Sequence, residues 1–450
     1  MKKILFKSAL LFFFLTHKAI YIKIAFAETG SESFYSLSDN LKISKENLRQ
    51  FKKLILPETE FLINSSQLSV KVRSQILPQG LNSRLHRVRT FHSFEVLPDA
   101  SIGVIKQNEG TDCRNPPAFA AVSDPLIKAK YTLWSDQFCG YPFQRYDFEL
   151  NLPETEFNGG LINGTLRRYY PGFDFDKSIV LYKERIEFPY PSPKNSFILL
   201  NFRLLTPEED PFWVRSFLLP SFTQMTSVNM QDPFFKKSFA PADFFSFSLK
   251  PSNYEYNQKV EDTLLLPFAF GMPRVERESE FCLLVEPKSE FADGSLPKIT
   301  LDQNVTTNQE SDEEPYKASD PFSFNTFFVP RQVQVVTFMP KDPYAEVGKE
   351  ILYVDQQLGR LIARMVYDQM FHPAKLVFTV YGLFERYDEP TNYEAFPVYQ
   401  LLYDFKTKIF QNLNFHRMIF CDKVPKELDL RLFDPITEEP TVVPPATKTK

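Results

Sequence analysis

Histidine and cysteine spacing in this chain supports neither a metal site nor a catalytic triad. After residue 27 the histidines are His86, His92, His372 and His416, and none lies in a His-x-x-x-His or Cys-x-x-Cys frame. Zinc sites usually show such spacings, so no metal or other cofactor is expected. The sequence also has no Gly-x-Ser-x-Gly elbow for a hydrolase nucleophile and no glycine-rich phosphate loop.

Carboxylates are the remaining candidates for chemistry. Asp355, Asp368 and Asp404 each stand at the end of an expected strand. A suitably spaced pair of carboxylates can hydrolyse a glycosidic bond, so an exported hydrolase is one alternative. Aspartate is also a typical turn-capping residue, and each of the three stands where a turn begins. We therefore interpret them as turn residues and expect no catalytic residues and no enzyme.

Four cysteines, Cys113, Cys139, Cys282 and Cys421, allow three disulfide pairings. Cys113 with Cys139 closes the shorter loop and is the first choice, which leaves Cys282 with Cys421. The alternative is four free, buried thiols that behave as small apolar groups. Both remain open, because the oxidation of an exported chain depends on its organism.

The N-terminus has the features of a secretory signal. Lys2 and Lys3 form a positive start, residues 10–15 are apolar, and Ala25-Phe26-Ala27 is a small-x-small cleavage site. We expect cleavage after Ala27, which places the chain in the periplasm, with association with the outer membrane open. An uncleaved anchor is the weaker alternative, because charged residues interrupt the apolar run.

Composition favours many short strands over long helices. The chain holds 47 Phe, 35 Pro and only 14 Gly among its 450 residues. The formal net charge is −4, so nothing indicates a nucleic-acid surface.

Residues 351–384 contain the clearest strand pattern. Three runs, ILYVD, RLIARMVYD and KLVFTVYGLF, are separated by short turns at 356–359 and 369–373. In the third run Phe378 and Tyr381 fall on opposite faces by alternation, and both faces are apolar. Such a sheet needs a cover on each side, and one side could hold an apolar guest.

Further strands are expected at 143–152, 160–170, 178–188, 196–205, 281–286, 331–338, 399–405 and 413–421. Asn163-Gly164 between apolar pairs predicts a tight hairpin turn. Residues 44–55, capped by Ser44 and closed by Pro57, predict a short amphipathic helix that packs on the sheet.

These elements predict four regions. Residues 1–27 form the signal peptide, 28–142 a helical and irregular segment packing on the sheet, 143–423 an antiparallel β half-barrel, and 424–450 a disordered tail.

An aromatic window spans 211–248. Its default interpretation is core, but a concave sheet is also a recurring site for a fatty group, since each buried methylene is worth roughly 0.8 kcal/mol. The residues expected to line such an apolar cavity are Trp213, Phe217, Phe234, Phe235, Phe244, Phe245, Met365, Tyr367, Phe378 and Tyr381.

Four stretches carry a resemblance to a known family. They are ISKENLRQFKKLILPETEFLI at 43–63, NPPAFAAVSDPLIKAKYTLW at 115–134, the segment 213–247 containing PADFFSF, and Pro343-Tyr344 followed by ILYVDQQLGRLIARMVYD. Their order resembles an exported Gram-negative family of unknown function described as outer-membrane lipoprotein-sorting-like, whose fold is similar to the LolA/LolB carriers. The chain departs from that family by keeping only Arg215 after the tryptophan and by having Pro241-Ala242 before Asp243.

The resemblance implies a fold that is mainly β with a few helices (α+β). Its core would be a curved, half-open antiparallel β-barrel of the lipoprotein-carrier type, with helices covering the mouth. It also implies a periplasmic, non-enzymatic protein that binds or transfers lipid, lipoprotein acyl chains or another hydrophobic molecule. An inner- or outer-membrane transport component is a further possible partner, and a structural or assembly role in such a system is the first alternative.

Overall fold

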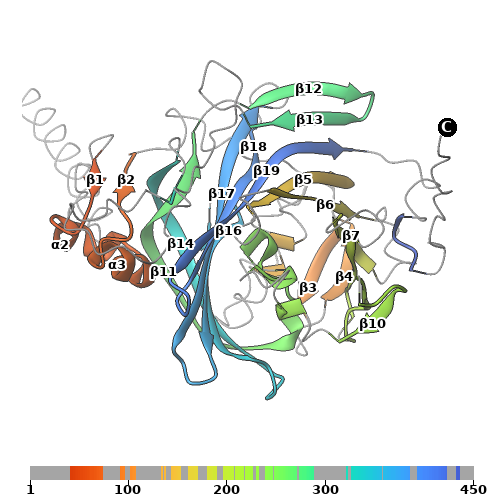
Figure 1. The fold of residues 1–450 in the computed structure, drawn as a ribbon, viewed down its shortest axis with the longest axis horizontal. Helices are drawn as coiled ribbons and strands as arrows, with labels where there is room; N and C mark the ends of the chain where they lie inside the picture. Colours follow the sequence, from red (N-terminus) through yellow and green to blue (C-terminus); the bar gives the residue numbers. More distant parts are fainter. Residues whose placement is uncertain are drawn as a thin grey trace, which may run out of the picture.

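One large, curled antiparallel sheet organises the molecule (Figure 1). The structure is a computed structural model, and it describes residues 41–73, 92–96, 102–107, 133–134, 136–137, 143–153, 161–170, 180–189, 196–206, 208–216, 218–226, 230–232, 239–246, 248–270, 273–287, 321–322, 326–356, 358–385, 393–422 and 432–435. The predicted signal peptide and tail, and Cys113 and Cys139, lie outside these residues. The four-region division stays a prediction.

The sheet has fifteen strands, and its main path runs β10-β9-β8-β7-β6-β5-β19-β18-β17-β11-β14-β15-β16. The hairpin of β12 and β13 joins it through β19, and β17 also pairs with β16. The bounds of these strands are β5 (Arg145–Pro153), β6 (Leu161–Tyr169), β7 (Val180–Phe188), β8 (Phe197–Leu204), β9 (Phe212–Arg215), β10 (Thr223–Met225), β11 (Tyr254–Ala269), β12 (Arg274–Ser279), β13 (Cys282–Glu286), β14 (Thr326–Pro340), β15 (Val347–Asp355), β16 (Arg360–Asp368), β17 (Pro373–Glu385), β18 (Tyr393–Asp404) and β19 (Ile409–Cys421).

Smaller elements complete the described fold. Two further sheets have two strands each, β1 (Lys42–Ile43) with β2 (Val70–Lys71) and β3 (His92–Val96) with β4 (Ile102–Gln107). The helices are α2 (Leu48–Phe51), η1 (Lys52–Leu54), α3 (Pro57–Asn64), η5 (Pro241–Ser246) and η6 (Pro251–Asn253). The predicted class, mainly β with few helices and a curled, half-open antiparallel sheet, is confirmed.

Each face of the sheet is covered by a different apolar cluster. On one face α2 contributes Leu48, and α3 contributes Leu62 and Ile63, to a cluster with Met365 and Phe378 of the sheet. On the other face η5 packs against β16, β17 and β18, and its aromatic side chains join a second cluster that includes β5 to β8. The expectation that the strands 351–384 are apolar and covered on both faces is therefore confirmed.

The three aspartates at strand ends cap turns. Asp368 Oδ1 accepts hydrogen bonds from the backbone N–H groups of Met370 and His372. Asp404 Oδ1 accepts hydrogen bonds from the backbone N–H groups of Lys406 and Thr407. Asp355 Oδ1 accepts from Leu358 N at 2.8 Å. Their interpretation as turn residues is confirmed, although Asp355 is also fully buried against Arg331.

One local prediction was wrong and one was incomplete. Asn163-Gly164 forms no turn but lies within β6, where Gly164 pairs with Leu150. A Cβ at Gly164 would lie 2.3 Å from the Phe188 ring, so glycine is needed there for close packing between strands. Pro57 does not merely end a helix but opens α3, because the first turn of a helix needs no N–H from proline.

The predicted helix at 44–55 is shorter than expected. Asn47, not Ser44, precedes the first helical residue, and the single α-turn of α2 tightens into η1. Strand β11 was missed altogether, because its first half, YEYNQKVED, is polar.

Candidate functional site

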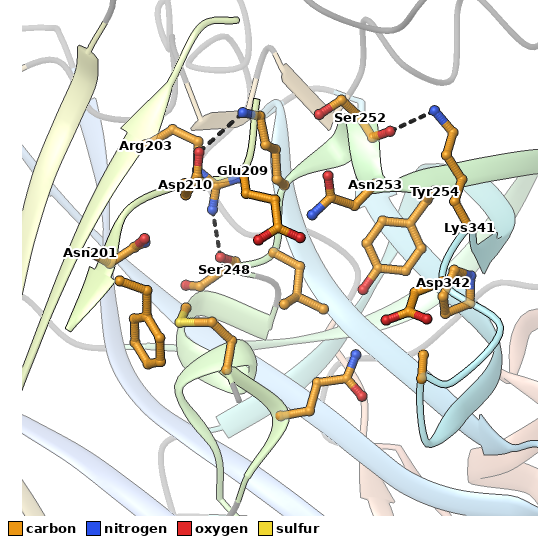
Figure 2. Close-up of a pocket in the computed structure, with 17 residues that line it drawn as sticks. Asn201, Arg203, Glu209, Asp210, Ser248, Ser252, Asn253, Tyr254, Lys341 and Asp342 are labelled. Carbon is orange, nitrogen blue, oxygen red and sulfur yellow. Dashed lines mark hydrogen bonds and ion pairs between the residues drawn. The ribbon is translucent and has the colours of Figure 1, made fainter. Parts of the chain in front are cut away.

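A pocket of about 420 Å³ lies beside the start of β11, where β8 and the β14–β15 loop approach each other (Figure 2). That volume is in the range of small-molecule sites. Its wall combines charged, polar and apolar side chains. The lining residues are Asn201, Arg203, Glu209, Asp210, Phe212, Met230, Gln231, Ser248, Leu249, Lys250, Ser252, Asn253, Tyr254, Pro340, Lys341, Asp342 and Ala345.

Strand alternation decides which side chains of β8 and β9 face the pocket. Asn201 pairs with Phe212, and Arg203 stands two residues further along the same face of β8. Trp213 is one residue away from Phe212, so it points to the opposite face. There its ring packs edge-on against Phe202 at 5.0 Å.

A buried ion cluster forms one wall of the pocket. Asp210 Oδ2 lies 3.1 Å from Arg203 Nε, and Asp210 Oδ1 lies 3.1 Å from Lys250 Nζ (Figure 2). Arg203 Nη2 also donates to the carbonyl of Ser248, and Lys250 Nζ donates to the carbonyl of Glu208. Two cations therefore share one carboxylate in a place that water barely reaches.

Burial and charge act in opposite directions on these groups. Burial lowers the pKa of Lys250, and the nearby Asp210 only partly offsets that effect. For Arg203 burial also acts to lower the pKa, but Asp210 and Tyr182 outweigh it, so its pKa is raised and the guanidinium stays charged. Burial, followed by Glu350, raises the pKa of Tyr254 well above its usual value, so this tyrosine is neutral.

Three residues of the pocket wall carry polar atoms that lack a hydrogen-bond partner among the described residues. The atoms are Nε and Nη1 of Arg203, Nδ2 of Asn201 and the hydroxyl of Ser252, although Nε lies in an ion pair with Asp210. Their side chains are at least nine-tenths buried. A buried polar group without a partner is costly, so each of these positions needs a partner that the described residues do not supply.

None of the described residues that were expected to line an apolar cavity lines this pocket. Phe244 and Phe245 are buried within the curl, where Phe245 stacks on Phe415 at 5.7 Å. Phe217, Phe234 and Phe235 lie outside the described residues. Their role as ligand contacts stays a prediction.

The residues of that set on β16 and β17 lie in the cluster beneath the helices. Met365, Phe378 and Tyr381 are buried there, and Tyr367 donates from its hydroxyl to Glu58 Oε1 of α3 at 3.0 Å. Tyr381 was assigned to the opposite face from Phe378, but the β17–β18 register shifts between Val380 and Tyr381 and both belong to one cluster.

Arg203, Asn201 and Ser252 were missed by the sequence interpretation. The available signal was the strand FILLNFRL, in which two polar residues, two apart, interrupt an otherwise apolar face. A long polar side chain on the buried face of a strand usually needs a partner or a ligand. The contribution of Ser252, 49 residues later in the chain, has no local signature.

Other features bear on the expected chemistry. Asp355 and Asp368, considered as a hydrolytic pair, do not line the pocket. The described part of the chain contains no cluster of three or more potential metal ligands. None of its helices is both long and apolar enough to cross a bilayer.

Cys282 and Cys421 form a disulfide with a Cα–Cα distance of 4.1 Å. They are directly opposed in the β13–β19 pairing, so the bond fastens the β12–β13 hairpin to the main sheet. This is the pairing that remained after Cys113 was assigned to Cys139.

No family model matches the sequence, and no curated protein matches it. Among solved structures, the fold is similar to a Vibrio parahaemolyticus domain described as an outer membrane lipoprotein-sorting protein, at 12% identity and a TM-score of 0.38, over 64% of this chain and 91% of that one. It is also similar to a DUF1329 family protein from Desulfovibrio piger, at 10% identity and a TM-score of 0.39, over 69% and 98% of the two chains.

A LolA superfamily protein from Nitrosomonas europaea is similar at 11% identity and a TM-score of 0.34, over 67% and 96% of the two chains. The lipoprotein-sorting and LolA groups are those named by the sequence resemblance. Because these TM-scores are below 0.5, the likenesses concern the fold and not the function.

Proposed function

We propose that this chain is an exported, non-enzymatic binding protein that holds a small amphiphilic, lipid-like molecule in the pocket between β8, the start of β11 and the β14–β15 loop. The single observation that carries the proposal is the mixed wall of that pocket. Polar donors without partners stand beside apolar side chains in a space of about 420 Å³. An amphiphile is the class of molecule that satisfies both kinds of surface.

The apolar part of the wall suits a short length of acyl chain. Phe212, Met230, Leu249 and Pro340 supply apolar surface, and Tyr254 adds a ring whose hydroxyl bonds to Glu350. Each methylene buried there contributes roughly 0.8 kcal/mol without needing a specific contact. On the concave side of β16, β17 and β18, the side chains of η5 occupy the space that a ligand would otherwise need.

Periplasmic location, transfer of lipid or lipoprotein acyl chains, and a membrane transport partner are finer parts of the proposal. The signal-like N-terminus supports export. The absence of nucleophile and metal frames in the sequence supports binding without catalysis.

Native mass spectrometry of the gently purified protein tests the proposal, followed by titration with a fluorescent acyl probe. Ala345→Trp should block the pocket, because Ala345 is buried in its wall. Tyr344→Trp is the matched control, since the neighbouring side chain is exposed. We expect the wild type and Tyr344→Trp to bind the probe and Ala345→Trp to lose it. Equal binding by a folded Ala345→Trp variant, or no binding by the wild type, would overturn the proposal.

An assembly or docking role is the second candidate, and exposed apolar side chains at two adjacent turns favour it. Tyr344 is 86% exposed on the β14–β15 loop, and Met370 is 74% exposed on the β16–β17 turn. The turns are joined by a hydrogen bond from Gln369 Nε2 to the Ala345 carbonyl. Exposed apolar side chains that gather into one patch are typical of contact with a membrane or another protein.

A further inference from the structure

The pocket contains more buried positive charge than buried negative charge. Arg203 and Lys250 are two cations, Asp210 is one anion, and all three are buried. Behind the wall, the buried pairs of Arg168 with Glu184 and of Arg364 with Glu350 each add one charge of each sign. The remaining charges of the pocket wall, Glu209, Lys341 and Asp342, are exposed at the rim, where solvent screens them. The buried side chains that line the pocket therefore carry a net charge of +1.

The free hydrogen-bonding groups on this wall are donors. In the Arg203 guanidinium, Nη2 donates to the Ser248 carbonyl and Nε lies in an ion pair 3.1 Å from Asp210, while neither Nε nor Nη1 makes a hydrogen bond among the described residues. The ring of Tyr182 stands 5.6 Å from the guanidinium carbon and supports it from one side. Two further donors, Asn201 Nδ2 and the Ser252 hydroxyl, lack partners in the same wall.

The arrangement is held rigidly. Asn201 and Arg203 are fixed on one face of β8, and Ser252 belongs to η6, whose end leads directly into β11. The Ser252 carbonyl is fixed by Lys341 Nζ at 2.8 Å (Figure 2). Donors held by strands lose little conformational freedom when a ligand binds, which favours affinity.

We infer that Arg203, Asn201 and Ser252 form an anion subsite that takes the acidic headgroup, a carboxylate or a phosphate, of the amphiphile. Planar or tetrahedral oxyanions accept several hydrogen bonds at once, and the fork of an arginine suits them. The assignment names the headgroup class for the pocket and so rests on the proposed function. It also explains why the fold keeps three polar groups buried without partners.

The test compares three probes with the same twelve-carbon chain, dodecyl phosphate, dodecanoate and dodecyltrimethylammonium, together with inorganic phosphate, by isothermal titration calorimetry. The wild type should bind the two anionic amphiphiles at least about tenfold more tightly than the cationic one. Ser252→Ala and Asn201→Leu should each reduce that preference about tenfold. Both variants should also unfold at the same or a higher urea concentration than the wild type when no ligand is present, because each removes an unpartnered buried group.

Thr59→Val is the matched control. Its hydroxyl is also buried without a partner among the described residues, but it lies on α3, away from the pocket. This variant should leave binding of the anionic probes unchanged. Arg203→Lys keeps the charge but not the fork, and it should weaken dodecyl phosphate more than dodecyltrimethylammonium.

The outcomes separate the two proposals. If the three amphiphiles bind equally and Ser252→Ala changes nothing, the anion subsite is overturned while amphiphile binding stands. If inorganic phosphate binds and no amphiphile does, the subsite stands and the proposed function is overturned. If no probe binds, both are overturned.

Discussion

Arg364 of β16 and Asp243 of η5 form a buried ion pair, with Nη1 and Oδ1 2.9 Å apart. The same guanidinium nitrogen donates to the carbonyl of Ala242, and Nε donates to Glu350 of β15. Lys375 and Gln400, from the next two strands, also reach Asp243. These contacts tie η5 to the three neighbouring strands β16, β17 and β18, so they determine where its aromatic side chains lie inside the curl.

Replacing Arg364 by methionine should destabilise the protein strongly. The variant leaves Asp243 and Glu350 buried without their common cation, and breaking such a pair costs roughly 3–5 kcal/mol. Urea unfolding followed by tryptophan fluorescence measures the loss. Arg274→Met on β12 is the control, because its ion pair with Glu276 is exposed and should change stability by less than about 1 kcal/mol. Equal effects of the two substitutions would show that burial of the Arg364 pair has no special importance.

Removing the Cys282–Cys421 disulfide should lower the free energy of unfolding by up to about 5 kcal/mol, since the bond closes a loop with a sequence separation of 139. The double variant Cys282→Ser/Cys421→Ser and either single variant should be destabilised to a similar extent, because each breaks the same bond. Thermal unfolding without reductant gives the comparison. A double variant as stable as the wild type would show that this bond does not constrain the unfolded chain.

Asp136 should make the protein less stable as the pH rises. Burial raises the pKa of Asp136 above the usual value. The charge of Arg360 and a hydrogen bond from Leu361 N to Asp136 Oδ1 at 3.3 Å lower the pKa, but by less than burial raises it. A raised pKa means that the folded state holds the proton more tightly than the unfolded state does. The stabilisation is therefore complete below the unfolded pKa of about 3.9 and is lost as the pH rises through the folded pKa.

Asp136→Asn, which cannot ionise, provides the comparison for this pH dependence. The unfolding free energy of the wild type minus that of the variant should become more negative between pH 4 and pH 8. Urea titrations at several pH values measure the difference. A difference that stays constant over this range would contradict the raised pKa.

The exposed residues Tyr344 and Met370 should matter for docking but not for stability. Their side chains lie almost entirely in solvent, so a Tyr344→Ser/Met370→Ser variant should unfold within about 0.5 kcal/mol of the wild type. If these turns contact a lipid surface, flotation with phosphatidylglycerol vesicles should recover less of the variant. Ile409→Ser, at an exposed position on β19, is a control for general loss of apolar surface. Equal recovery of all three proteins would remove the support for a membrane-docking role of the two turns.

The sequence by itself determined most of the strands and their turns. Period-two patterns located β15, β16 and β17, and Asp368 and Asp404 identified the turns because an aspartate side chain bonds to backbone N–H groups only a few residues away. Such signals are local, so one sequence is enough to detect them. Gly164 could not be interpreted from local sequence, because glycine is needed there for packing against the Phe188 ring of a neighbouring strand.

Only the tertiary structure decided where a ligand could bind. The aromatic window identified Trp213, but pairing and alternation turn Phe212, Asn201 and Arg203 toward the pocket and Trp213 away from it. Ser252 and Lys341 reach the same pocket from positions about fifty and 140 residues further along the chain. A binding site of this kind is made by long-range pairing and by the burial of charge, and neither has a pattern that a short stretch of sequence can show.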